Sequence, residues 1–98
     1  MPRPIPEHLR HGLEEYVRIG RPTGDFLEAV LSNDLKASFA RADATSQAYM
    51  HAIVMYIMWE IPAVAQGSPD AYKAWCRKGG LEGIERERQA QEAVSCET

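Results

Sequence analysis

The chain has 98 residues, of which 45% are hydrophobic and 26% are charged, as in one soluble globular domain. Its net charge of −3 argues against a nucleic-acid-binding protein, because such proteins usually gather a basic excess on one face. We also expect no membrane segment, since the most apolar run, AIVMYIMW, is far shorter than the roughly 20 residues that cross a bilayer.

The N-terminus, MPRPIPEH, lacks the apolar stretch of a signal peptide. Cys76 and Cys96 do not form a C-x-x-C motif, and two cysteines cannot define a disulfide scaffold. We therefore expect reduced thiols in a cytoplasmic protein. The chain contains no G-x-S-x-G, P-loop or H-E-x-x-H motif. The sequence thus predicts neither an enzyme nor a cofactor.

Helical periodicity between glycine and proline breaks predicts an all-α fold, since no segment alternates as a strand does. The first helix should cover about residues 6–19, with Pro6 in its first turn and Gly20 and Pro22 ending it. It carries one apolar stripe, formed by Leu9, Leu13, Tyr16 and Val17.

The stretch AVLSNDLKASFARAD, residues 29–43, admits two interpretations. One helix over 25–42 would carry apolar residues four apart, but it would place Asp34 on the apolar side, where an unpaired carboxylate is costly. Asn33 is instead a favoured N-cap residue. We therefore expect a break, with Asn33 as the cap, Asp34 in the following first turn, and helices over about 25–32 and 34–42.

Asp43 predicts the next N-terminus, and a helix over about 44–60 follows it and ends before Pro62. Apolar residues cover nearly its whole circumference: Ala48, Tyr49, Met50, Ala52, Ile53, Val54, Met55, Tyr56, Ile57, Met58 and Trp59. A helix that is apolar all round must be enclosed. We therefore expect a compact bundle of five helices around this central helix, completed by a second subunit or a partner.

The segment GSPDAYKAWCRKGG is typical of a short capped helix, with Ser68 as the cap, Pro69 in the first position and Gly79–Gly80 at its end. Its buried side should hold Tyr72, Trp75 and Cys76. Residues 1–80 are then one helical domain. Residues 81–98 form a polar C-terminal helix or tail, anchored by Leu81 and Ile84 and frayed toward its end.

Several of these segments resemble a group of small accessory proteins encoded by tailed phages and prophages. The shared pattern is G-x-F-L-x-A-V-L-x-N-D-L, an Ala-Asp pair, an apolar helix that ends at Pro, and G-S-P before a Trp. The matching residues are Gly24, Phe26, Leu27, Ala29, Val30, Leu31, Asn33, Asp34, Leu35, Ala42, Asp43, Pro62, Gly67, Ser68, Pro69 and Trp75. The resemblance implies a phage accessory protein made in the bacterial cytoplasm, and it implies no particular activity.

Several groups of residues could carry chemistry. His8, His11 and Glu15 share one side of the first helix at spacings that suit a divalent metal, but Arg10 and Arg18 flank them, which favours a solvated face and no metal. His51 lacks a recognisable nucleophile and orienting acid, so we expect a core or interface histidine. At Gly24–Asp25 and Ser68–Asp70, acidic first turns favour capping over anion binding.

The methionine and aromatic residues of the 44–60 helix suggest either core or an adaptable recognition surface. We predict a non-enzymatic binding module that engages a host protein, such as a defence component, or a second copy of itself through Tyr49, Met50, Tyr56, Ile57 and Trp59. The alternative is a small-molecule binder that sequesters a nucleotide signal with Arg21, Arg41, Tyr49 and Tyr72. A metal-dependent hydrolase is the third hypothesis.

Overall fold

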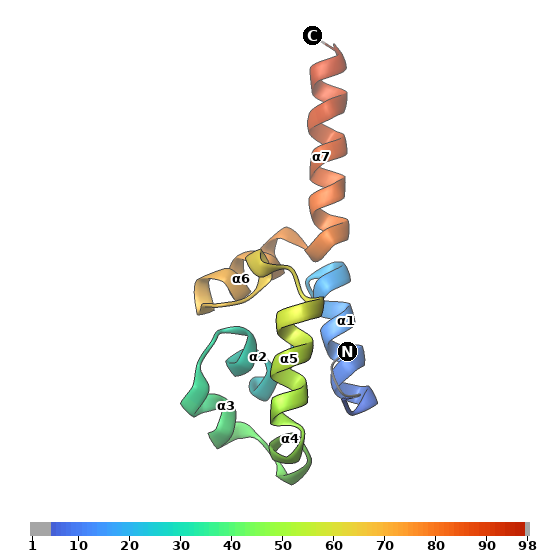
Figure 1. Ribbon diagram of the computed structural model, residues 1–98. Helices are drawn as coiled ribbons and strands as arrows, with labels where there is room; N and C mark the ends of the chain where they lie inside the picture. The colour runs from blue at the N-terminus through green and yellow to red at the C-terminus, as the bar shows by residue number, and fades with distance from the viewer. Residues whose placement is uncertain (1–4, 98) are drawn as a thin grey trace.

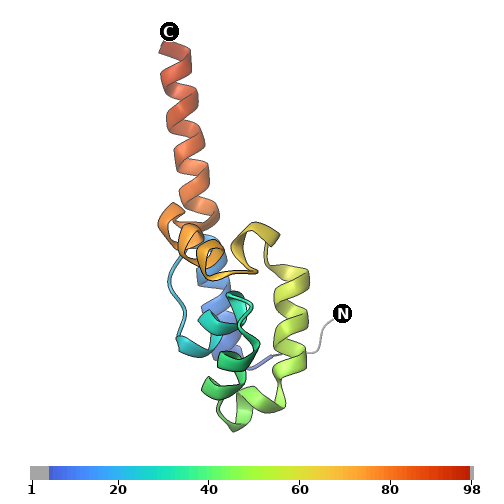
Figure 2. The same cartoon turned by 90° about the vertical axis from the view of Figure 1, so that its left-hand side faces the viewer.

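The computed structural model describes residues 5–97, with side chains for residues 5–91. Within this part of the chain all regular structure is helical: α1 (Glu7–Ile19), α2 (Asp25–Leu31), α3 (Leu35–Arg41), α4 (Ala44–Ala48), α5 (Met50–Glu60), the 3-10 turn η1 (Ala63–Ala65), α6 (Pro69–Lys78) and α7 (Gly80–Glu97). Figures 1 and 2 show a body made of α1 to α6, from which α7 extends. The predicted all-α class is confirmed.

The core lies where α1, α2, α5 and α6 present apolar side chains to one another. Leu13 and Tyr16 from α1, Leu31 from α2 and Ile53 from α5 are fully buried there. Tyr72 and Trp75 of α6 complete the cluster, as their i, i+3 spacing predicts. The Tyr16 and Tyr72 rings stack with their centroids 5.2 Å apart. This core joins four helices that are distant in sequence, and it sets the position of α5.

Hydrogen bonds complete the aromatic part of this core. The Tyr16 hydroxyl donates to the carbonyl oxygen of Ala65 at 2.7 Å, and the Trp75 indole N–H donates to the carbonyl oxygen of Tyr16 at 2.7 Å. The Tyr72 hydroxyl accepts from the backbone N–H of Thr23 at 2.8 Å. Because buried polar atoms are costly when unpaired, these bonds allow the three large rings to be buried. They also tie α1 to η1 and α6.

The break between α2 and α3 is confirmed, but the predicted roles of its residues are wrong. Asp34, and not Asn33, is the N-cap of α3, and its Oδ1 accepts from the backbone N–H of Ala37 at 3.1 Å. Asn33 has φ 63°, a left-handed conformation that asparagine tolerates better than most residues. The cap therefore lies one residue later than expected, and Asn33 makes the turn.

The expected central helix over 44–60 is also different. It is divided at Tyr49 (φ −101°, ψ 10°) into α4 and α5, although Asp43 caps α4 as predicted by accepting from the Ser46 N–H at 2.7 Å. Nor do the other helices surround α5. Figure 2 shows it along one side of the body, where it forms one wall of the core. The predicted bundle around a central helix is therefore not confirmed.

The junction of α6 with α7 depends on glycine. Gly79 ends α6 in a left-handed conformation (φ 80°), as predicted, and α7 begins at the next residue. Gly80 packs directly against the end of α1, where a Cβ on Gly80 would lie 2.5 Å from the Gly20 nitrogen. The sequence predicts that Leu81 and Ile84 anchor this helix, but both are exposed. The start of α7 is held against α1 by the glycine contact instead.

Candidate functional site

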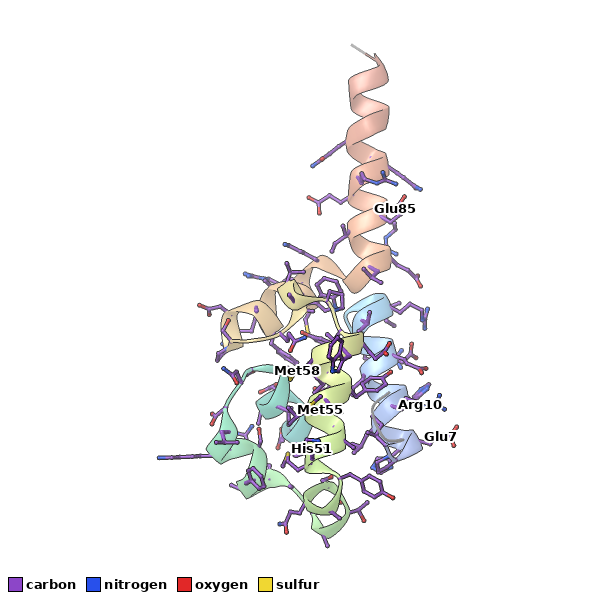
Figure 3. The ribbon with its side chains drawn as sticks, viewed as in Figure 1. Glu7, Arg10, His51, Met55, Met58 and Glu85 are labelled. Carbon is purple, nitrogen blue, oxygen red and sulfur yellow. The ribbon has the colours of Figure 1, made fainter. Side chains whose placement is uncertain are left out.

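The outward side of α5 is an apolar surface that the rest of the described chain does not cover. Met50, Ile53 and Ile57 are buried, and the outward part of the helix carries Val54, Met55, Met58 and Trp59. We call these four residues the α5 strip. Met58 and Trp59 are largely exposed, Val54 partly so, and Met55 is half-buried. Figure 3 shows His51, Met55 and Met58 following one another along this helix.

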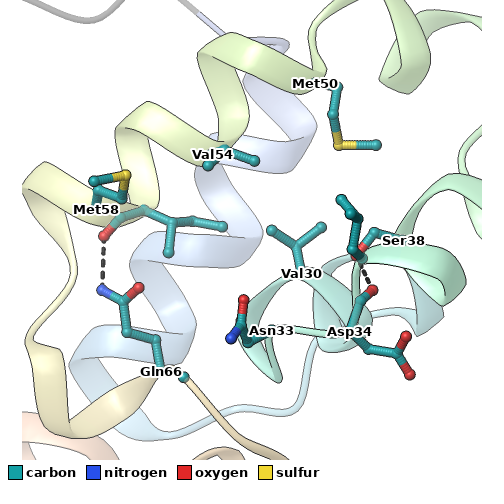
Figure 4. Close-up of a pocket in the computed structure, with 11 residues that line it drawn as sticks. Val30, Asn33, Asp34, Ser38, Met50, Val54, Met58 and Gln66 are labelled. Atoms are coloured by element: carbon teal, nitrogen blue, oxygen red, sulfur yellow. Dashed lines mark hydrogen bonds between the residues drawn. The ribbon is translucent and has the colours of Figure 1, made fainter.

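A groove of about 230 Å³ runs beside the strip, between α5 and the turn that joins α2 to α3. Val54, Met58 and Met50 line its α5 side, and Val30, Leu35 and Asp34 lie across from them (Figure 4). We call it the α3–α5 groove. Leu35 and the neighbouring Phe39 add two exposed apolar side chains on α3. The strip and groove together can receive apolar side chains of another molecule.

Polar groups mark the ends of this groove. The Gln66 amide nitrogen donates to the carbonyl oxygens of Ile57 and Ile61, both at 2.9 Å. These bonds give the carbonyl groups at the C-terminal end of α5 a hydrogen-bond partner. Ser38 donates to the Asp34 carbonyl oxygen at 2.6 Å, and Asp34 caps α3. These side chains are therefore occupied in holding the helices, and apolar contact dominates what the groove offers.

The strip itself carries no formal charge, because residues 50–59 include no Asp, Glu, Lys or Arg. Charged residues flank it: Glu60 follows Trp59 on α5, Asp34 lines the groove, and on α1 Arg10 lies between Glu7 and Glu14 at 3.5 and 3.7 Å. Partial burial, together with Glu14 and Glu60, raises the pKa of Tyr56 on the flank of α5. A strip without Asp, Glu, Lys or Arg suits recognition of apolar protein side chains better than binding of a phosphate or another small ion.

The predicted partner-binding residues divide into two groups. Trp59 and Tyr49 are exposed and Tyr56 is half-buried, whereas Met50 and Ile57 are buried and line only the inner side of the α3–α5 groove. Sequence reasoning missed Leu35, Phe39 and Val54, and it named Met58 only among the methionines that could form either core or a recognition surface. A signal for two of these was present: once Met50, Ile53 and Ile57 are assigned to the core by i, i+3, i+7 spacing, Val54 and Met58 fall on another side of the helix.

The residues of the predicted nucleotide site are engaged elsewhere. Tyr72 is buried, stacked on Tyr16 and bonded to Thr23, so its ring cannot stack on a base. Arg21 lies 3.5 Å from Glu15, and Arg41 donates to the carbonyl oxygen of Asp25 at 3.2 Å. Tyr49 stands at the junction of α4 and α5. The nucleotide-binding hypothesis therefore loses Tyr72 as a stacking residue, whereas Tyr49 remains exposed.

The candidate metal ligands lie on the exposed side of α1. Glu15 is held by Arg18 and Arg21, and the Arg18 guanidinium lowers the pKa of its carboxyl group. The His11 Nε2 atom is 3.9 Å from Glu15, and His8 is exposed. Among residues with described side chains, no three His, Cys, Asp or Glu groups are placed to hold a metal ion. His51 is exposed on α5, so the core alternative is wrong, and a place in an interface with another molecule stays a prediction.

Comparison of the chain with family models, curated proteins and solved structures finds no match. Over its described residues, no helix has both the length and the apolar character needed to cross a bilayer. The apolar surface of α5 is therefore the feature of this chain that bears on its function.

Proposed function

We propose that this protein is a non-enzymatic binding module that docks on a partner protein through the α5 strip and the α3–α5 groove. The observation that carries the proposal is the contrast between the two sides of α5. Its inner side is packed in a core whose aromatic polar groups are hydrogen-bonded, while its outer side leaves Met58 and Trp59 in water. Large apolar side chains gathered on a surface mark interaction sites in soluble proteins.

The residue types on this surface support the same proposal. Methionine is flexible and polarisable and adapts to differently shaped partners, and tryptophan is enriched among the residues that contribute most to binding energy. The resemblance to phage accessory proteins, carried by residues such as Asn33, Asp34 and Ser68, favours a host protein as the partner. Binding there would act by covering a surface of the host protein.

The test is capture of partners from a bacterial lysate by immobilised wild type and by three variants. Met58→Glu and Trp59→Glu place a charge on the α5 strip, and Ile84→Glu places one on an exposed apolar position of α7 as the matched control. We expect the control to retain the captured protein, identified by mass spectrometry, and both strip variants to lose it. Retention by the strip variants would contradict the proposal.

A further inference from the structure

The apolar surface around α5 is large enough for a stable protein interface. Trp59 and Phe39 are 71% and 49% exposed, which leaves on the order of 250 Å² accessible, given about 150–250 Å² for an aromatic side chain. Leu35, Met58 and Val54, at 70%, 61% and 38%, bring the apolar total to on the order of 500 Å².

This area can be compared with what a dimer requires. One partner of a standard interface contributes about 800 Å², of which about 56–65% is apolar, or about 500 Å². The exposed residues of α3 and α5 therefore supply the apolar area of one complete partner. A surface patch of this size stands at the upper end of what soluble monomers expose.

Two copies of the α5 strip can also pack against each other. Charged residues near the two-fold axis of a symmetric pair would meet their own counterparts, and their repulsion would oppose self-association. Residues 50–59 carry no Asp, Glu, Lys or Arg, so two copies of the strip meet without it. His51, beside the strip, is the one titratable imidazole on α5, and Glu60 follows the strip at the end of the helix. The methionines adapt their side chains to a symmetric contact.

We infer that the α5 strip, together with the neighbouring Leu35 and Phe39 of α3, is covered by the same surface of a second copy of this chain, in a symmetric homodimer with Met55 near the two-fold axis. Met55 lies midway between His51 and Trp59 along the helix, and residues near such an axis meet their own counterparts. The inference rests on the proposed function, because both use the same surface. A host protein would then compete with the second copy for it.

Sedimentation velocity at protein concentrations from 1 to 100 μM tests this inference. We expect the wild type and Ile84→Glu to reach twice the 11.0 kDa chain mass in the upper part of this range. Met58→Glu should shift the dimerisation midpoint at least about tenfold, because each dimer would bury two uncompensated carboxylates. Circular dichroism checks that each variant keeps its helices. A wild type that remains monomeric at 100 μM would overturn the inference.

A cross-link tests which face is used. In a Cys76→Ser, Cys96→Ser background, Met55→Cys should form a disulfide-linked dimer under mild oxidation, whereas Ile84→Cys should not. A dimer that cross-links only through position 84 would place the interface elsewhere and overturn the inference. A monomeric wild type that still captures a host protein through Met58 and Trp59 would leave the proposed function standing. If the dimer cross-links through position 55 but Met58→Glu and Trp59→Glu still capture the same host protein, the inference would stand and the proposed function would be contradicted.

Discussion

Two adjacent residues, Asn33 and Asp34, turn the chain between α2 and α3 by different means. Asn33 adopts the left-handed conformation (φ 63°), and its backbone N–H donates to the Val30 carbonyl oxygen at 3.0 Å. Asp34 then caps α3 through the Ala37 N–H. The turn also forms one edge of the α3–α5 groove, so these two residues position Leu35 beside the α5 strip.

Substitutions at these two positions should separate the conformational role from the capping role. Asn33→Ala should cost about 1 kcal/mol because alanine is strained at positive φ, and Asn33→Gly should be neutral or slightly stabilising. Asp34→Ala should cost about 1 kcal/mol, while Asp34→Asn should be mild because asparagine also caps. Urea unfolding measures all four free energies. Equal effects of Asn33→Ala and Asn33→Gly would show that position 33 acts through its side chain instead.

Cys76 is a second residue whose environment makes a prediction. It is half-buried on α6, and this burial raises the pKa of its thiol. Because the thiolate is the reactive form, a raised pKa leaves less of it at pH 8. In a Cys96→Ser variant, alkylation of Cys76 by iodoacetamide at pH 8 should be slower in the folded protein than in urea. Equal rates in the two states would contradict the burial of this thiol.

Among the elements, the contact between the end of α1 and the start of α7 depends most on glycine, because neither Gly20 nor Gly80 carries a side chain. Gly20 and Gly80 both have positive φ, 71° and 67°, and their backbones meet so closely that a Cβ on either would overlap the other chain segment. The ion pair between Arg18 and Glu82 at 3.0 Å lies beside this contact. Two glycines far apart in sequence thus let α7 leave the body at this point.

Three glycine substitutions should therefore have different effects. Gly20→Ala and Gly80→Ala should each cost at least about 2 kcal/mol, from strain at positive φ and from overlap with backbone that cannot move aside. Gly12→Ala should stabilise by about 0.5–1 kcal/mol, because its Cβ would meet Leu27 at an ordinary 3.7 Å and alanine favours the helix. Thermal unfolding of the three variants checks the order. A stabilising Gly80→Ala would rule out this close approach.

Local signals in the sequence predict most of these elements. Pro6, Gly20, Asp43, Ser68 and Gly79 each mark a helix end through their own backbone or side-chain chemistry, and the structure places helix ends there. What the sequence does not reveal is which side of α5 other helices cover. That depends on the directions of α1, α2 and α6, which the core contacts of Tyr16, Tyr72 and Trp75 determine. The assumption of full enclosure therefore did not separate the buried Met50 and Ile57 from the exposed Trp59.

At the scale of the whole molecule, α5 both closes the core and presents an apolar outer surface. The core uses Ile53 and Ile57, and the α5 strip uses Met58 and Trp59, so folding and binding depend on different sides of one helix. Figure 1 shows α7 projecting away from the body, at the opposite end from α4. Substitutions on the strip should accordingly affect association while leaving the fold intact.

The free energy of unfolding of the Met58→Glu, Trp59→Glu double variant tests this central claim most directly. It should be measured at 1 μM, where association contributes least to apparent stability. If the strip serves binding, the double variant should match the wild type within about 0.5 kcal/mol, as exposed substitutions usually do, and should lose association at higher concentration. A loss of 2 kcal/mol or more at 1 μM would show that Met58 and Trp59 belong to the core of the folded chain, and would contradict the assignment of the α5 strip as a binding surface.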